Sequence, residues 1–107
     1  MLKPSRRRSA DHPTGAQLRA ARGLLNMSVL ELTELTKLSI NTVKRAEAVN
    51  TPAPVNAATA QLLVSSLGAA GVVFIPATDE SGAGVRLRDP SLARVLHHRR
   101  RNKSVEE

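Results

Sequence analysis

Three helix-start signals stand close together in the first half of the chain, and their spacing restricts how it can fold. Thr14 is followed three residues later by Gln17, and Ser28 by Glu31. Each pair matches the capping box, in which a hydroxyl and the side chain three residues on bind free amides at a helix start. Ser39 can cap a third helix. The pattern predicts a helix-turn-helix, with helices over about residues 15–25, 29–36 and 40–48.

Apolar side chains recur at helical spacing inside these segments. Leu18, Ala21 and Leu25 fall on one face of the first predicted helix. Gly23 costs that helix about 1 kcal/mol relative to alanine, and it would allow a close helix crossing. Further apolar contacts around the turn are expected from Leu32, Leu35, Leu38 and Val43. The three helices should therefore share one small core.

The segments SVLELT, KLS and TVKRAE follow one another at the places where a known family has its own motifs. Members of the phage-repressor and Cro-like (XRE) helix-turn-helix family typically read S-Q-E-E-L-A, then G-V-S, then T-I, a basic residue, two further residues and E. The chain resembles this family over residues 15–47 and more loosely to Arg88. The resemblance implies a mainly α fold, a lambda-repressor-like bundle of about four helices.

Five positions depart from the family pattern. Leu30 and Leu35 replace polar residues on the outside of the second helix. Val29 replaces a glutamine that usually touches a backbone phosphate. Lys37 replaces the glycine of the turn, so this lysine would have to adopt a positive φ at some energetic cost. Ile40 stands where a base-reading polar residue often sits.

Length and composition bound the possible functions. With 107 residues, no cysteine and a formal charge of +7, the chain is expected to form one small domain with basic appendages. It offers no paired carboxylates, no nucleophile with a base and no zinc-finger pattern, so we expect neither an enzyme nor a metal or cofactor site. No membrane span or signal peptide is predicted, which favours a cytoplasmic, nucleoid-associated protein.

The positive charge gathers at both ends of the chain. Net charges are +3 for residues 1–13, +2 for 14–50, −1 for 51–89 and +3 for 90–107. A polyanion such as DNA is the natural partner of such a chain, although basic tails can also serve solubility alone. Residues 1–13 are predicted to form a disordered basic arm. Its residues Arg6, Arg7 and Arg8 could enter a minor groove, attract phosphates or have no role.

The third predicted helix is the candidate recognition helix. If its first residues point into a major groove, asparagine can pair with adenine, arginine with guanine, and an apolar side chain can meet a thymine methyl. The candidate base contacts are Ile40, Asn41, Thr42 and Arg45. The candidate phosphate contacts are Ser28, with the helix start that it caps, and Ser39, Lys44, Arg19 and Lys37. Glu47 is expected to form a structural hydrogen bond, since phosphates would repel its carboxylate.

The second half of the chain should complete the fold. Asn56 is a good cap for a helix over about 57–70, which closes the helix-turn-helix domain of residues 14–70. Residues 71–89 contain an apolar β-branched run, a turn-rich segment and a run in which apolar and polar residues alternate, which predicts a β-hairpin. This hairpin could pack on the helices or serve as a dimerisation element. Asp89-Pro90-Ser91 can start a short helix, followed by a basic tail within residues 90–107.

Two functions remain open from the sequence. The first is a sequence-specific regulator of transcription, by default a repressor, which binds double-stranded DNA as a homodimer. The alternative is an antitoxin or antiactivator whose apolar residues Val29, Leu30 and Leu35 bind a protein partner. Packing of these side chains under the N-terminal arm or the C-terminal segment is the favoured explanation for them. A nucleoid-coating protein without sequence preference is a further possibility.

Overall fold

The computed structural model describes residues 12–92, which form four helices followed by a two-stranded antiparallel hairpin. In chain order these elements are α2 (Gly15–Leu25), α3 (Val29–Thr36), α4 (Ile40–Glu47), α5 (Ala57–Ala70), β1 (Val72–Ile75) and β2 (Gly84–Leu87). The predicted layout, mainly α with a hairpin after the helices, is confirmed. The basic arm through residue 11, with Arg6, Arg7 and Arg8, and the tail from residue 93 lie outside the described residues.

Each helix begins at the residue that the sequence indicated. Thr14 and Ser28 form complete capping boxes with Gln17 and Glu31, and the side chains of Ser39 and Asn56 accept hydrogen bonds from the amides of Thr42 and Thr59. The helix ends also follow local rules, because α2 and α3 stop where one residue enters the left-handed region. These residues are Asn26, with φ 56°, and Lys37, with φ 66°. The positive φ expected of Lys37 is therefore confirmed.

The core lies where α2 meets α4, α5 and the hairpin. Its buried side chains come from every described helix, from β1 and from the loop after α4: Leu18, Ala21, Leu25, Leu32, Val43, Ala46, Ala53, Leu63, Leu67 and Val72. Two expectations were wrong. Leu35 is 48% exposed, because the inner side of α3 is taken by Leu32 and Thr36. A Cβ on Gly23 would meet no atom within 4 Å, so this glycine serves no close helix crossing.

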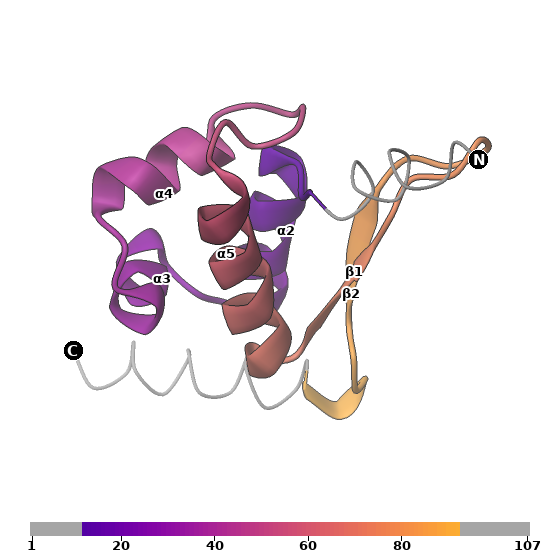
Figure 1. Ribbon diagram of the computed structural model, residues 1–107. Coiled ribbons are helices and arrows are strands. Elements are labelled where there is room, and N and C mark those ends of the chain that lie inside the picture. Colours follow the sequence, from indigo (N-terminus) through magenta and orange to yellow (C-terminus); the bar gives the residue numbers. More distant parts are fainter. Residues whose placement is uncertain (1–11, 93–107) are drawn as a thin grey trace.

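The hairpin pairs Val72 with Leu87 and Ile75 with Gly84. Figure 1 shows α3 and α4 on one side of α2 and the hairpin on the other. One face of the hairpin packs against the core through Val72, Phe74, Val85 and Leu87. The hairpin therefore leans on the helices, as one of the two sequence-based expectations had it.

The buried side chain of Gln17 fixes the end of the hairpin next to its turn to α2. Its amide nitrogen donates to the carbonyl oxygens of Ile75 at 3.3 Å and Gly84 at 3.0 Å. Its amide oxygen accepts from the backbone N–H of Thr14 at 2.9 Å. One side chain thus caps a helix and positions two strands.

The segment before α2 is held against the loop that follows α4. The amide of Ala53 donates to the carbonyl of Pro13 at 3.0 Å, and the amide of Gly15 donates to the carbonyl of Thr51 at 3.1 Å. A ring nitrogen of His12 also lies 2.9 Å from the carbonyl oxygen of Ala53. The start of the described chain is therefore attached close to the end of α4.

Beyond the hairpin, Asp89 organises a turn. Its carboxylate accepts from the amide and the hydroxyl of Ser91, both at 3.0 Å, and these bonds lower the pKa of Asp89 below its ordinary value. Leu92 donates to the carbonyl of Asp89, as expected of a helix start. The predicted course of that helix lies outside the described residues.

Candidate nucleic-acid interface

The candidate recognition helix α4 divides cleanly into an inner and an outer side. Val43, Ala46 and Glu47 are buried against the rest of the bundle. Because α-helical positions three and four apart share a side, these three residues form one face, and the outer side carries the remaining residues of the helix. Its exposed members are Ile40, Asn41, Lys44 and Arg45. We call these four residues the outer α4 face.

The outer α4 face holds three of the four predicted base-reading residues. Ile40 is 38% exposed, and Asn41 and Arg45 are also exposed. Thr42 differs, because it is half-buried and its hydroxyl lies 2.9 Å from that of Ser39 at the helix start. Thr42 therefore takes part in capping α4, while the other three present their side chains to solvent.

The polar members of the outer α4 face are free to bind a ligand. Within residues 12–92, no hydrogen bond or ion pair is formed by the side chains of Asn41, Lys44 and Arg45. Lys37 is exposed at the turn that precedes α4, and its side chain too has no partner in this part of the chain. These side chains supply two lysines, one arginine and one amide around a single helix.

The N-terminus of α3 offers less to a phosphate than its cap suggested. The Ser28 hydroxyl accepts from the amide of Glu31 at 3.0 Å, and the Glu31 carboxylate accepts from the amide of Ser28 at 2.8 Å. Two helix-start amides are thus satisfied, and a carboxylate lies beside the positive end of the helix dipole. A phosphate there would depend on the hydroxyl proton of Ser28 and the other first-turn amides.

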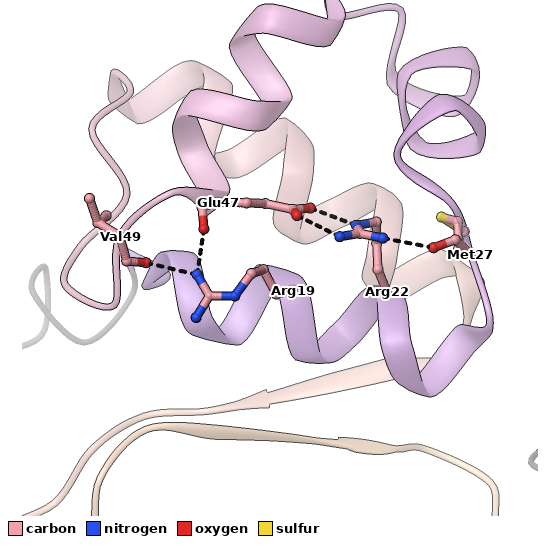
Figure 2. Close-up of polar contacts among 5 residues, drawn as sticks. All are labelled: Arg19, Arg22, Met27, Glu47 and Val49. Atoms are coloured by element: carbon pink, nitrogen blue, oxygen red, sulfur yellow. Dashed lines mark hydrogen bonds and ion pairs between the residues drawn. The ribbon is translucent and has the colours of Figure 1, made fainter.

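Arg19 binds the C-terminal end of α4. Its guanidinium donates to the carbonyl oxygens of Glu47 and Val49, the latter at 3.4 Å (Figure 2). It also donates to the side-chain oxygen of Asn50. The last carbonyls of a helix have no partners within the helix, so these bonds complete its end. A phosphate could use only the remaining N–H groups of Arg19.

Arg22 and Glu47 form a two-pronged ion pair between α2 and α4. Nε of Arg22 donates to one carboxylate oxygen and Nη2 to the other, both at 2.7 Å, while Nη1 donates to the carbonyl of Met27 at 3.1 Å (Figure 2). The hydrogen bond to Glu47 raises the pKa of Arg22 above its ordinary value. The expected structural role of Glu47 is confirmed, and the pair fixes how α4 lies on α2.

The ion pair of Arg22 with Glu47 was not predicted from the sequence, although a signal was present. Glu47 falls on the buried side of α4 with Val43 and Ala46. A carboxylate in that position needs a cation or several donors. The arginines of α2 were the available cations on the neighbouring helix, so the buried side of α4 could have indicated the partner.

Apolar residues of α3 separate into two groups. Val29 is half-buried and packs against the core. Leu30 is 61% exposed and Leu35 is 48% exposed, and the arm and the C-terminal segment under which they were expected to pack lie outside the described residues. They leave an apolar surface on α3.

Within residues 12–92, no group of three histidine, cysteine or acidic side chains is arranged to hold a metal ion. None of the described helices combines the length and the hydropathy that crossing a membrane requires.

Comparisons with known proteins add no relative. The chain matches no family model, no curated protein and no solved structure.

Proposed function

We propose that this protein is a sequence-specific regulator of transcription that binds double-stranded DNA through the outer α4 face. A major groove admits one α-helix, and asparagine and arginine on that helix can read adenine and guanine. The outer α4 face supplies Asn41 and Arg45 for this purpose, with Ile40 for apolar contact. Lys44, Lys37 and Ser39 would hold phosphates and fix the register.

The division of the arginines carries this proposal. The guanidinium groups of Arg19 and Arg22 donate hydrogen bonds to the end of α4, to the loop after it and to the carbonyl of Met27. The side chains of Arg45 and Lys44, in contrast, have no partner within residues 12–92. The first pair makes α4 rigid, and the second leaves its outer side charged. A rigid helix with unpaired cations and an amide suits a polyanion better than an apolar protein partner.

One recognition helix reads only a few base pairs, so we propose that two copies bind a two-fold-related site. Half-sites about 34 Å apart, one turn of DNA, would give the missing affinity and specificity. Repression by blocking polymerase is the simplest mechanism. This function would place the protein on the nucleoid, in the cytoplasm.

Binding to duplexes tiled across the gene's own upstream region tests the proposal. Fluorescence anisotropy at two salt concentrations should find one duplex that binds more tightly than a scrambled one. Arg45→Ala and Asn41→Ala should each weaken binding to that duplex by roughly 5- to 150-fold, because a bidentate base contact is worth about 1–3 kcal/mol. Lys44→Ala should weaken all duplexes alike and lower the salt slope by about 1.

Arg86→Ala is the matched control. Arg86 is exposed on β2, on the other side of α2 from α4, and its removal changes the net charge by the same amount as Arg45→Ala. Equal weakening by both substitutions, with every duplex bound alike, would count against sequence reading and favour a nucleoid-coating protein.

The second candidate function is binding of a protein partner through α3, as in an antitoxin or antiactivator. The exposure of Leu30 and Leu35 favours it. Leu30→Ser with Leu35→Ser should then abolish regulation in cells while the purified protein still binds DNA normally. Unchanged regulation in cells would remove this candidate.

A further inference from the structure

Ile40, the first residue of α4, has an apolar side chain that the fold does not use. It is 38% exposed, and within residues 12–92 it belongs neither to the core nor to the apolar residues packed against the core. Isoleucine is also a weaker helix former than alanine or leucine, because its branched Cβ loses freedom in a helix. Neither packing nor helix propensity therefore explains an isoleucine at this position.

The neighbours of Ile40 on the outer α4 face are polar or charged. Residues four apart lie one above the other on a helix, so Ile40 stands in line with Lys44, and Asn41 stands in line with Arg45. Ile40 is thus the single apolar member of this exposed face. An apolar protein partner that covered Ile40 would also have to desolvate the two cations, whereas DNA offers phosphates to them.

Thr42 does not compete with Ile40 for a base. Its hydroxyl lies 2.9 Å from that of Ser39, and its amide donates to the Ser39 hydroxyl at 3.1 Å, so Thr42 is engaged at the helix start. The first residues of a recognition helix are the ones that meet base edges. Ile40 and Asn41 are therefore the exposed residues of the first turn of α4 that can do so.

The major groove offers one kind of apolar group to such a side chain. Its base-pair edges present hydrogen-bond donors and acceptors and, in addition, the C5-methyl group of thymine. An isoleucine placed against any other edge leaves a donor or an acceptor without a partner, which is unfavourable. Against the methyl group, both partners remove apolar surface from water. The same group, on the same ring atom, is present in 5-methylcytosine.

We propose that Ile40 binds the C5-methyl group of a pyrimidine, and that the protein therefore binds more tightly where a cytosine at this position is methylated at C5. The inference rests on the proposed function, and it makes affinity depend on a chemical mark in addition to sequence. An apolar side chain forms no hydrogen bond with O4 of thymine or N4 of cytosine, so this contact accepts both methylated bases. Contacts to the paired purine still distinguish them.

The structure holds Ile40 in place before DNA arrives. Isoleucine in a helix adopts mainly one χ1 rotamer. The helix itself is fixed on α2 by the two hydrogen bonds from Arg22 to Glu47, both at 2.7 Å (Figure 2). Little conformational freedom is therefore lost when the side chain meets a methyl group, so the gain from burying that group is retained as affinity.

Single methyl groups in the DNA test the proposal. In the duplex that binds most tightly in the tiling experiment, each thymine is replaced in turn by uracil, and each cytosine by 5-methylcytosine. These replacements remove or add the methyl group and leave the hydrogen-bonding edge unchanged. At one position of each half-site, the base with the methyl group should bind about fourfold more tightly than the base without it, the contribution of one buried methyl group. The T·A and C·G pairs should show the same ratio there.

Variants of Ile40 show whether this side chain recognises the methyl group. Ile40→Gln should bind the methylated and unmethylated duplexes alike, because a polar side chain gains nothing from an added methyl group. Ile40→Val keeps the branched Cβ and should keep most of the preference. Leu62→Gln is the matched control, since Leu62 is 39% exposed on α5, and it should keep the preference in full. Circular dichroism checks that all three variants are folded.

Three results would overturn the inference while leaving the regulator standing. The first is a specific duplex whose affinity no single methyl substitution changes. The second is a preference for the methyl group that persists in Ile40→Gln, which would assign it to another residue or to the shape of the DNA. The third is a preference for thymine over uracil without one for 5-methylcytosine over cytosine. Equal binding of every tiled duplex would instead remove the regulator, and this inference with it.

Discussion

Gln17 is a single residue that serves two parts of the fold. In a capping box, glutamate is as suitable as glutamine, because the helix start needs only an acceptor at this position. The carbonyls of Ile75 and Gly84, however, need N–H donors, and only the amide supplies them. With 6% of its surface exposed, Gln17 has little access to water that could replace these bonds.

Gln17→Glu should therefore destabilise the protein, by about 2–4 kcal/mol at pH 7, because it places a buried carboxylate against two carbonyl oxygens. The loss should be smaller at pH 4, since a protonated carboxyl can donate one hydrogen bond. Urea denaturation followed by circular dichroism measures both values. Gln61→Glu, the same change at an exposed position of α5, should alter stability little. Equal effects of the two substitutions would contradict the role given to Gln17.

Lys37 shows the cost of a left-handed residue at a helix end. Its φ of 66° suits glycine, and a side chain in this conformation costs roughly 1–2 kcal/mol. Since glycine also loses more chain entropy on folding, we expect Lys37→Gly to be more stable than Lys37→Ala by about 1 kcal/mol. Both variants lose the same charge, so their urea midpoints isolate the backbone contribution. A more stable alanine variant would contradict this reading of the turn.

Among the elements, α2 contains two glycines whose surroundings differ: one is tightly packed and the other faces open space. A Cβ on Gly15 would lie 2.0 Å from the carbonyl oxygen of Val49 and 2.8 Å from that of Ala46, whereas a Cβ on Gly23 would meet nothing within 4 Å. Gly23→Ala should stabilise the protein by about 0.5–1 kcal/mol through helix propensity alone. Gly15→Ala should destabilise it, because α2 and the end of α4 would have to separate. Thermal unfolding of the two variants should shift in opposite directions.

The contact between α2 and α4 can be measured through Arg22 and Glu47. The two side chains are 20% and 7% exposed, so the pair is only partly screened by water. A double-mutant cycle with Arg22→Met and Glu47→Gln should give a coupling energy of about 1–3 kcal/mol. The raised pKa of Arg22 means that its contribution is complete below its unfolded pKa and is lost only as the pH rises through the folded one. The coupling should thus be the same at pH 7 and pH 10.

Local sequence signals predicted the helices and strands well, but they did not predict the contacts between residues far apart in the sequence. The four helix starts follow from Thr14, Ser28, Ser39 and Asn56, because a cap depends on residues three positions away at most. The partners of Gln17 lie 58 and 67 residues along the chain, and Glu47 lies 25 residues from Arg22, so no spacing rule relates them.

The outward position of Leu35 shows that local patterns can also fail to predict which residues of one helix are buried. The sequence placed Leu32 and Leu35 together, since residues three apart share a helix face. In α3, however, Thr36 is the second buried residue, and its hydroxyl donates to the carbonyl of Leu32 at 2.8 Å. In a helix of two turns, the neighbouring helices decide which of these residues is buried.

Across the whole molecule, charge is distributed unevenly. Exposed Asp79 and Glu80 lie in the turn of the hairpin, and the exposed cations Lys37, Lys44 and Arg45 surround α4. Figure 1 places the hairpin and α4 on different sides of α2. If the proposed function holds, this arrangement repels the hairpin turn from DNA and turns α4 towards it.

Reversing the charges of the hairpin turn should lower specificity. Asp79→Lys with Glu80→Lys raises the formal charge from +7 to +11 and gives the protein a second basic end. Binding to a scrambled duplex should tighten more than binding to the specific one, because non-specific binding depends almost entirely on charge. Asp79→Asn with Glu80→Gln should give an intermediate effect. An unchanged ratio of the two affinities, measured by anisotropy, would contradict the orienting role of the turn.

The distance in sequence between Gln17 and Gly84 has a consequence for folding during synthesis on the ribosome. Residue 84 is added 67 residues after Gln17, which takes roughly 3–13 s at about 5–20 residues per second. Through that interval α2 is already made, but its hairpin-facing side has no strand to cover it. Although α2 is the first helix in the described part of the chain, its contacts are thus among the last to be completed, and a nascent chain would expose it to chaperones for seconds.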